Sequence, residues 1–228
     1  MVVLATKIYV SGDARERTLD SLRSLVGNEL GDLEVEYEVG IRHDDFPSVT
    51  VEGEDATVAR NVLREAFGEI VPDLQPGESY VGTLESWDDN GFVLDAGQPV
   101  RIPADELGLG AGSPPQIRER FGLVQHLPMQ FVYGDVEEGG DTPSRLADAE
   151  RDRLYDWTRG DGRLNVNSAT RAEVRATLNR AGHAQDYVTI ERLGLLEQSV
   201  ICPEDTDPPG LLASVGKYLP AELRCVVP

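Results

Sequence analysis

The chain has 228 residues, of which 41 are Asp or Glu and 21 are Lys or Arg, and its formal net charge is -20. A hydrophobic fraction of 40% beside 27% charged residues is typical of globular domains and excludes a mainly disordered chain. Because it has no run of about 18 apolar residues and no basic segment leading into an apolar one, we expect neither a membrane span nor a signal peptide. We therefore expect a soluble cytoplasmic protein.

The balance of charged residues is unusual, because the only lysines are Lys7 and Lys217. An excess of carboxylates with almost no lysine is typical of extreme halophiles, in whose molar salt the Debye length falls to about 3 Å and neighbouring carboxylates scarcely repel one another. The alternative is an acidic interaction protein, although the acidic residues are spread through the chain. Two cysteines, Cys202 and Cys225, are too few for a disulfide framework and lack metal-ligand spacing.

Residues 1–76 predict an N-terminal α+β domain of order β-α-β-β-α. A β-rich run at 2–10 precedes Asp13 and Glu16, which have capping-box spacing before a helical pattern that reaches Leu30. Residues 33–41 alternate apolar side chains with glutamates, which predicts a strand with one buried face. A second strand is expected at 48–52. A helix capped by Asp55 should follow and bury one face, carrying Val58, Val62, Phe67 and Ile70.

Residues 77–134 predict a β-barrel. Short strands are expected at 79–87, 91–96, 99–103 and 128–133, with a helix near 116–121, and this is the pattern of a five-stranded, partly open OB-fold. Residues 135–160 follow as a connector, with a helix expected from Pro143 to Arg159 after the Glu137-Glu138-Gly139-Gly140 break.

Residues 161–228 predict a ferredoxin-like domain of order β-α-β-β-α-β. Strands are expected at 163–167, 187–192, 196–202 and 222–227. Thr170 and Glu173 form a capping box for the first helix, and Pro208-Pro209 begins the second, which we expect at about 208–219. The whole chain is therefore expected to be α+β with three small domains.

The sequence contains no motif that predicts an enzyme. The histidines His43, His126 and His183 are far apart and have no metal-ligand pattern beside them. Gly108–Gly112 is followed by Ser-Pro-Pro, whose prolines remove the N–H donors that a phosphate-binding loop needs. Adjacent acidic pairs such as Asp88-Asp89 are expected on so acidic a surface. We expect no catalytic residues, no metal and no cofactor.

The middle segment resembles a known RNA-binding module. The runs Tyr80-Val-Gly82-Thr-Leu84, Gly91-Phe-Val-Leu-Asp95-Ala-Gly97 and Val100-Arg101-Ile102-Pro103 are similar to the ribosomal S-one type of OB-fold. This resemblance implies an RNA-binding face on which Arg101 occupies a position that is often basic. The family usually carries an aromatic where this chain has Val93, so Trp87 and Phe92 are the candidate stacking residues. Arg118 and Arg120, on the expected helix, are candidate phosphate contacts, and a barrel that serves only as a scaffold is the alternative.

The acidity of the chain does not exclude a nucleic acid partner. Counterion release contributes little in molar salt, so stacking and cation–π contacts carry relatively more of the affinity. The last segment, 161–228, has 7 basic and 9 acidic residues and is the least acidic part. Arg171 and Arg175 are one helical turn apart there and are candidate phosphate contacts, unless they only solvate an exposed helix face.

The chain as a whole resembles a haloarchaeal domain-of-unknown-function family, on the strength of Leu164-Asn-Val-Asn-Ser-Ala-Thr-Arg, Glu191-Arg-Leu-Gly-Leu-Leu-Glu and Thr206-Asp-Pro-Pro-Gly-Leu-Leu-Ala-Ser-Val-Gly216. The leading hypothesis is a non-enzymatic factor that contacts RNA, or a ribosomal or transcription complex, through its barrel. The alternative is a ligand-sensing regulator or interaction scaffold whose last domain binds a metabolite at the Thr206–Gly210 helix start. A protein partner is compatible with either hypothesis, and a membrane partner with neither.

Overall fold

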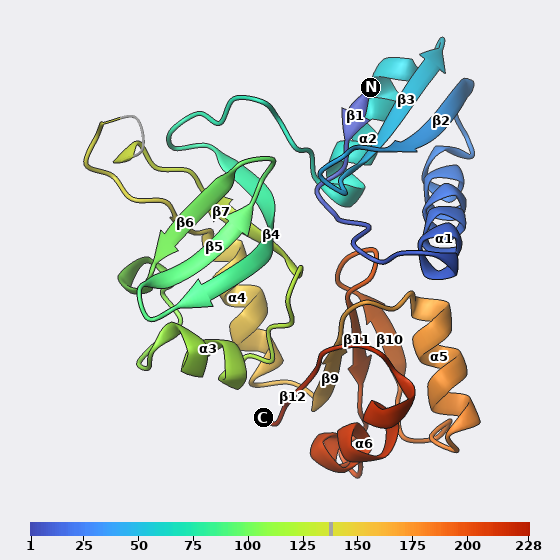
Figure 1. Ribbon diagram of the computed structural model, residues 1–228, viewed down its shortest axis with the longest axis vertical. Helices are drawn as coiled ribbons and strands as arrows, with labels where there is room; N and C mark the ends of the chain where they lie inside the picture. Colours follow the sequence, from blue (N-terminus) through green and yellow to red (C-terminus); the bar gives the residue numbers. More distant parts are fainter. Residues whose placement is uncertain (137–138) are drawn as a thin grey trace.

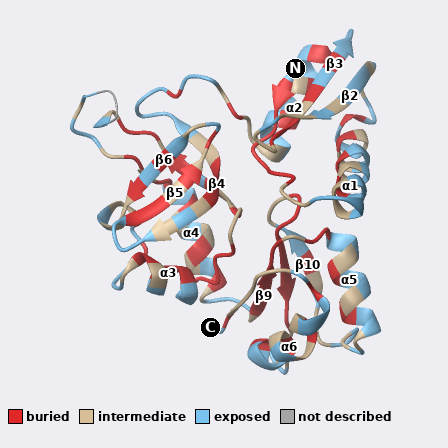
Figure 2. Cartoon of the chain, in the orientation of Figure 1, coloured by how far each residue is buried: buried red, intermediate tan, exposed pale blue. Residues whose placement is uncertain are grey.

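The computed structural model describes residues 1–136 and 139–228, and it shows three separate β-sheets with helices packed against them (Figure 1). Buried residues follow the strands of the central and C-terminal sheets and the chain that leaves β1 (Figure 2). Among the described residues, none of the helices is both long enough and apolar enough to cross a membrane.

The N-terminal part contains β1 (Val2–Val3), α1 (Asp13–Leu30), β2 (Val35–Ile41), β3 (Pro47–Gly53) and α2 (Ala56–Phe67). Its antiparallel sheet has the order β1-β3-β2. The strand expected at 2–10 is short, because beyond Leu4 the chain leaves the sheet and runs toward the other two parts (Figure 1).

Three local expectations for the N-terminal part were wrong. The N-cap of α1 is Gly12, at φ 58°, with no side-chain cap from the expected box. Helix α2 buries Ala56, Ala59 and Leu63, while Val58 is 49% exposed, so the buried face of the helix is not the one expected. Strand β2 is an edge strand, so its apolar face is only partly covered and Tyr37 is 38% exposed.

The central part is a curled antiparallel half-barrel of five strands in the order β6-β5-β4-β7-β8. The strands are β4 (Ser79–Asp88), β5 (Gly91–Asp95), β6 (Pro99–Pro103), β7 (Pro128–Val132) and β8 (Arg145–Leu146). A short 3-10 helix η1 (Ala104–Glu106), then α3 (Pro114–Arg120) and α4 (Asp148–Trp157), complete this part. Helices α3 and α4 contribute Ile117, Leu154 and Trp157 to the same hydrophobic core as the strands.

The helix expected from Pro143 to Arg159 begins later, at Asp148. Residues 145–146 form β8 instead, which pairs Leu146 with Phe131 and Arg145 with Val132. Leu146 is fully buried, and its place in the half-barrel core explains why the chain is extended there.

The C-terminal part contains β9 (Arg163–Val166), α5 (Arg171–Arg180), β10 (Thr189–Arg192), β11 (Gln198–Ile201), α6 (Pro208–Val215), η3 (Gly216–Tyr218) and β12 (Leu223–Val226). The sheet order is β10-β11-β9-β12, with every pair antiparallel. The Thr170–Glu173 capping box at the start of α5 is present, as predicted. Leu164, Val166 and Val200 pack against the helices.

Candidate nucleic-acid interface

The aromatic pair predicted to stack on RNA does not form an exposed platform. Phe92 is fully buried in the half-barrel core, so its assignment as a nucleic acid contact was wrong. Trp87 lies directly across from Phe92 on the neighbouring strand, and its ring is partly buried. The guanidinium carbon of Arg118 lies 3.5 Å from the centroid of the Trp87 ring.

Arg118 itself is 4% exposed and forms an ion pair with Glu222 of the C-terminal part. Burial lowers the pKa of Arg118, and the pairing with Glu222 acts against this shift. A guanidinium that is stacked, paired and buried is not available to a phosphate, so Arg118 was also wrongly assigned. Its role is to join the central and C-terminal parts.

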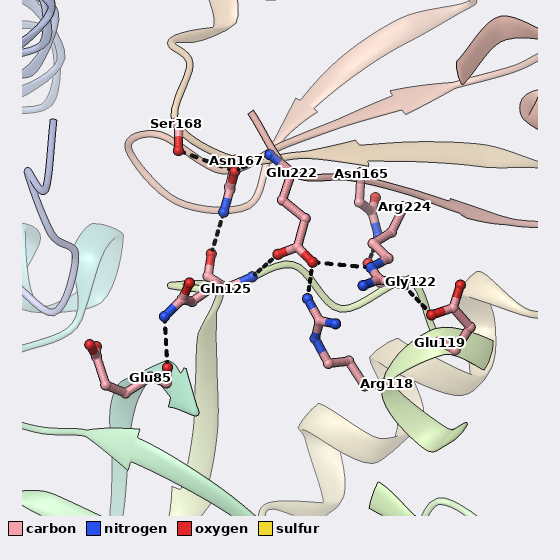
Figure 3. A network of polar contacts seen from close by, with 10 residues as sticks. All are labelled: Glu85, Arg118, Glu119, Gly122, Gln125, Asn165, Asn167, Ser168, Glu222 and Arg224. Atoms are coloured by element: carbon pink, nitrogen blue, oxygen red, sulfur yellow. Dashed lines mark hydrogen bonds and ion pairs between the residues drawn. The ribbon is translucent and has the colours of Figure 1, made fainter. Parts of the chain in front are cut away.

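Figure 3 shows the polar network to which Arg118 belongs. The backbone N–H of Gln125 donates to Glu222 Oε2 at 2.8 Å, and Asn165 Nδ2 donates to the carbonyl of Gly122 at 2.9 Å. Asn167 Oδ1 accepts from the Glu222 N–H at 2.8 Å, while its Nδ2 donates to the Gln125 carbonyl. These bonds fix the C-terminal sheet against the segment that follows α3.

The remaining basic residues predicted on the barrel are exposed but already have partners. Arg101 donates to both carboxylate oxygens of Asp88, at 3.0 and 3.1 Å, and this pairing lowers the pKa of Asp88. Arg120 donates to the carbonyl oxygens of Leu109 and Ala111 and so holds the glycine-rich loop. The half-barrel surface therefore offers a phosphate fewer free N–H donors than the sequence suggested.

Arg171 and Arg175 lie in a different environment, on the exposed face of α5 opposite its buried Val174 and Leu178. They line a groove between α1 and α5, whose outer part has a volume of about 510 Å³. The outer lining consists of Ser21, Arg171, Ala172, Arg175, Ala176 and Asn179.

An inner pocket of about 290 Å³ shares Ser21 and Arg171 with the outer part of the groove. Its other lining residues are Leu25, Arg192, Leu195 and Gln198. Arg192 and Gln198 face each other across β10 and β11. We call the outer part and the inner pocket together the α1–α5 groove.

The arginines of this groove are free of carboxylates. Within the described residues, the arginines without an ion pair are Arg60, Arg120, Arg159, Arg171, Arg175, Arg180 and Arg192. Three of these seven line the groove, and none of its described lining residues is acidic. The groove is therefore a positively charged region on a chain of net charge -20, and it attracts an anionic partner.

The one acidic group at the start of α5 is already engaged. Glu173 accepts from the Thr170 N–H at 2.9 Å and pairs with Arg17 at 3.0 Å. Burial acts to raise the pKa of Glu173, but these hydrogen bonds outweigh it and leave the pKa below its usual value. Glu173 therefore occupies the helix N-terminus and is held there, so the attraction for an anion comes from the arginines.

Lys7 and Tyr9, in the segment that follows β1, help to hold the N-terminal part against the rest of the molecule and thereby fix the groove. Lys7 Nζ lies 3.0 Å from Glu85 Oε2 and 2.6 Å from Asp95 Oδ2, in the half-barrel. Tyr9 Oη donates to Glu197 Oε1 at 2.7 Å and accepts from the Ser168 N–H at 2.9 Å. Glu197 is fully buried, and this burial raises its pKa to about 8.

The groove residues missed by sequence reasoning include Ser21, Leu25, Arg192 and Gln198. Arg192 and Gln198 flank the loop of the β10–β11 hairpin, and the pocket that they line with Ser21 and Leu25 joins segments from opposite ends of the chain. The sequence carries no periodic signal for such a contact. By comparison, Arg171 and Arg175 were found because their spacing along one helix face is a local pattern.

The chain matches the DUF2110 N-terminal domain over residues 1–73, the DUF2110 central domain over 74–158 and the DUF2110 C-terminal domain over 161–227. The chain belongs to the DUF2110 family. No curated protein matches it. In this family's terms, the α1–α5 groove is formed by the DUF2110 N-terminal domain, through α1, and the DUF2110 C-terminal domain, through α5, β10 and β11.

Proposed function

We propose that this protein is an RNA-associated factor that acts by binding, without catalysis, and that the α1–α5 groove holds the RNA. The observation that carries the proposal is the set of Arg171, Arg175 and Arg192, which line one groove without a carboxylate partner. Most other cations of the described chain are neutralised by an acidic neighbour. Arg171 and Arg175 are one helical turn apart in the groove lining, which suits a polyanion that runs along the helix.

The proposed architecture supports this function. We assign the half-barrel to the OB-fold because of its topology. The consecutive strands β4, β5 and β6 are followed by helix α3. Strand β7 then pairs with the free edge of β4, and β8 pairs with β7. Strand order β10-β11-β9-β12, with α5 and α6 as crossovers, supports a ferredoxin-like C-terminal domain. Both folds occur among RNA-binding proteins, and we propose an S-one type relationship for the first.

We further propose a haloarchaeal origin, which the net charge of -20 and the two lysines support. In molar salt the Debye length is about 3 Å, so carboxylates outside the groove repel a bound polyanion weakly. Contacts made at short range, such as bidentate Arg–phosphate hydrogen bonds, persist under these conditions. Ribosomal or transcription complexes are the partners in which such RNA would be presented.

Fluorescence anisotropy with a labelled single-stranded RNA of about ten nucleotides tests the proposal, in about 0.2 M and about 2 M KCl. Wild-type protein should bind, and the double variant Arg171→Gln, Arg175→Gln should bind about tenfold more weakly or worse. Arg180→Gln is the matched control, because Arg180 is exposed on the same helix, has no ion pair and lies outside the groove lining. The proposal fails if wild type does not bind, or if the control loses as much affinity as the double variant.

A ligand-sensing regulator is the second candidate, and one observation favours it. A cavity of about 270 Å³ lies where the three domains meet, with Thr6, Phe67, Met129, Arg153 and Leu193 among its lining residues. The Thr206–Gly210 helix start is less suitable than expected, because Asp207 already accepts from the Gly210 N–H at 3.1 Å. A thermal-shift screen of metabolites tests this candidate, and a stabilising compound whose effect is lost in Met129→Trp would support it.

A further inference from the structure

One residue that lines the inner pocket of the α1–α5 groove has a buried polar atom with no partner. Gln198 is fully buried on β11, and its Nε2 donates to the carbonyls of Ala169 and Leu195, at 3.3 and 3.2 Å. Both amide hydrogens are therefore used, which identifies Oε1 as the acceptor that remains. Within the described residues, Gln198 Oε1 accepts no hydrogen bond.

A buried acceptor without a donor costs free energy, about 1–3 kcal/mol for a neutral group. Because Gln198 is one of the residues that line the inner pocket, this acceptor points to a ligand that brings the donor. The donor must protrude from its ligand, because Oε1 is itself buried.

The other walls of the pocket describe the rest of the ligand. Leu25 from α1 and Leu195 from the β10–β11 hairpin are apolar, whereas Arg171 and Arg192 carry positive charge. A flat apolar body with a protruding N–H group, attached to a phosphate, fits this combination. A volume of about 290 Å³ is sufficient for one nucleobase and its sugar.

We infer that the inner pocket receives one unstacked nucleobase that bears an exocyclic amino group, with the RNA backbone continuing across Arg171 and Arg175 in the outer groove. Adenine, cytosine and guanine carry such an amine, on N6, N4 and N2 respectively. Uracil has none, and its ring N–H lies between two carbonyl oxygens that would approach Gln198 Oε1. The pocket therefore discriminates against uracil.

This inference rests on the proposed function, since it names the part of the RNA that the groove recognises. Single-stranded RNA is commonly read in this way, through unstacked bases whose edges accept or donate hydrogen bonds inside a protein pocket. A free nucleotide offers the same chemistry as one nucleotide of an RNA strand. The two ligands differ at Arg175, which lies outside the inner pocket, because only an RNA strand should gain affinity from contacts there.

The sharpest test changes the RNA and leaves the protein intact. Anisotropy is measured for labelled oligomers of about ten adenosines, cytidines or uridines, and for one of purine riboside, which is adenosine without its amino group. We expect the adenosine and cytidine oligomers to bind about tenfold more tightly than the uridine and purine riboside oligomers. Competition by adenosine monophosphate shows whether a free nucleotide is enough to occupy the pocket. The variant Arg175→Gln should weaken the binding of the oligomers and leave the binding of adenosine monophosphate unchanged.

A protein variant provides the reciprocal test. Gln198→Met keeps the length of the side chain and removes the acceptor, so it should reduce the preference for adenosine over purine riboside to about one. Its melting temperature is measured beside wild type, because loss of the bonds to Ala169 and Leu195 acts on the fold as well. Equal binding of adenosine and purine riboside oligomers by wild type would overturn the base pocket while leaving the proposed function intact. Absence of binding by any RNA would overturn both.

Discussion

Replacing the fully buried Glu197 with glutamine should remove much of the pH dependence of stability. Glutamine keeps the oxygen that accepts from Tyr9 Oη and cannot ionise. In the wild type, burial raises the pKa of Glu197 from 4.5 to about 8. Between these two values the folded state holds a proton that the unfolded state has lost, so the free energy of unfolding falls as the pH rises.

The size of the effect follows from the pKa difference. One pKa unit corresponds to about 1.4 kcal/mol, so between about pH 4.5 and about pH 7 the wild type should lose about 3 kcal/mol that the variant keeps. Below about pH 4.5, Glu197 is protonated in both the folded and the unfolded protein, and above about pH 8 it is ionised in both. The difference between the two proteins is therefore expected to be flat at each end and to change only within this window.

Urea unfolding followed by tryptophan fluorescence at constant high salt measures this difference, with one series of pH values for each protein. Subtraction of the two curves removes the contribution of every other titrating group. The expected result is a difference that grows steadily between about pH 5 and about pH 8 in favour of the variant. Parallel curves would show that Glu197 ionises in the folded protein much as it does in the unfolded chain, and would refute the reasoning.

Three further changes test the contacts that fix the domains and the half-barrel. Tyr9→Phe removes the hydroxyl that donates to Glu197 and accepts from the Ser168 N–H, and should lower the free energy of unfolding by about 1–3 kcal/mol in a urea titration. Arg118→Ala removes one of the two arginines that pair with Glu222, which keeps Arg224 at 3.1 Å, and should cost about 1.5–3 kcal/mol, whereas a loss below about 1 kcal/mol would contradict the structural role given to this arginine. Gly91→Ala should destabilise the half-barrel, seen as a lower melting temperature, because a Cβ there would lie 2.0 Å from the Ile102 carbonyl oxygen at a φ of 146°; an unchanged melting temperature would contradict this.

Sequence patterns located most strands and helices because the signals for them are local. The Thr170–Glu173 box begins α5, and Gly91 and Pro99 begin strands that were expected at the same positions. Strand β8 was missed because two residues carry no periodicity, and only its pairing with β7 makes it a strand.

The site was less predictable, because exposure depends on contacts between distant segments. Arg118 and Glu222 are 104 residues apart, and nothing in either neighbourhood marks them as partners. Phe92 and Val93 are adjacent, so one must face the core, and the position of the β4–β5 pair decides which. Gln198 carries no sequence signal as a ligand contact, because its free acceptor follows from the two hydrogen bonds that its amide donates in the fold.

The most direct test of RNA association is to purify the tagged protein from a native lysate kept at molar KCl and to measure the RNA that accompanies it. We expect wild-type protein to carry RNA that ribonuclease removes, and we expect this RNA to be strongly reduced with Arg171→Gln, Arg175→Gln but retained with Arg180→Gln. Wild-type protein that purifies free of RNA, or RNA that is equally abundant on all three proteins, would contradict the claim that the α1–α5 groove binds RNA.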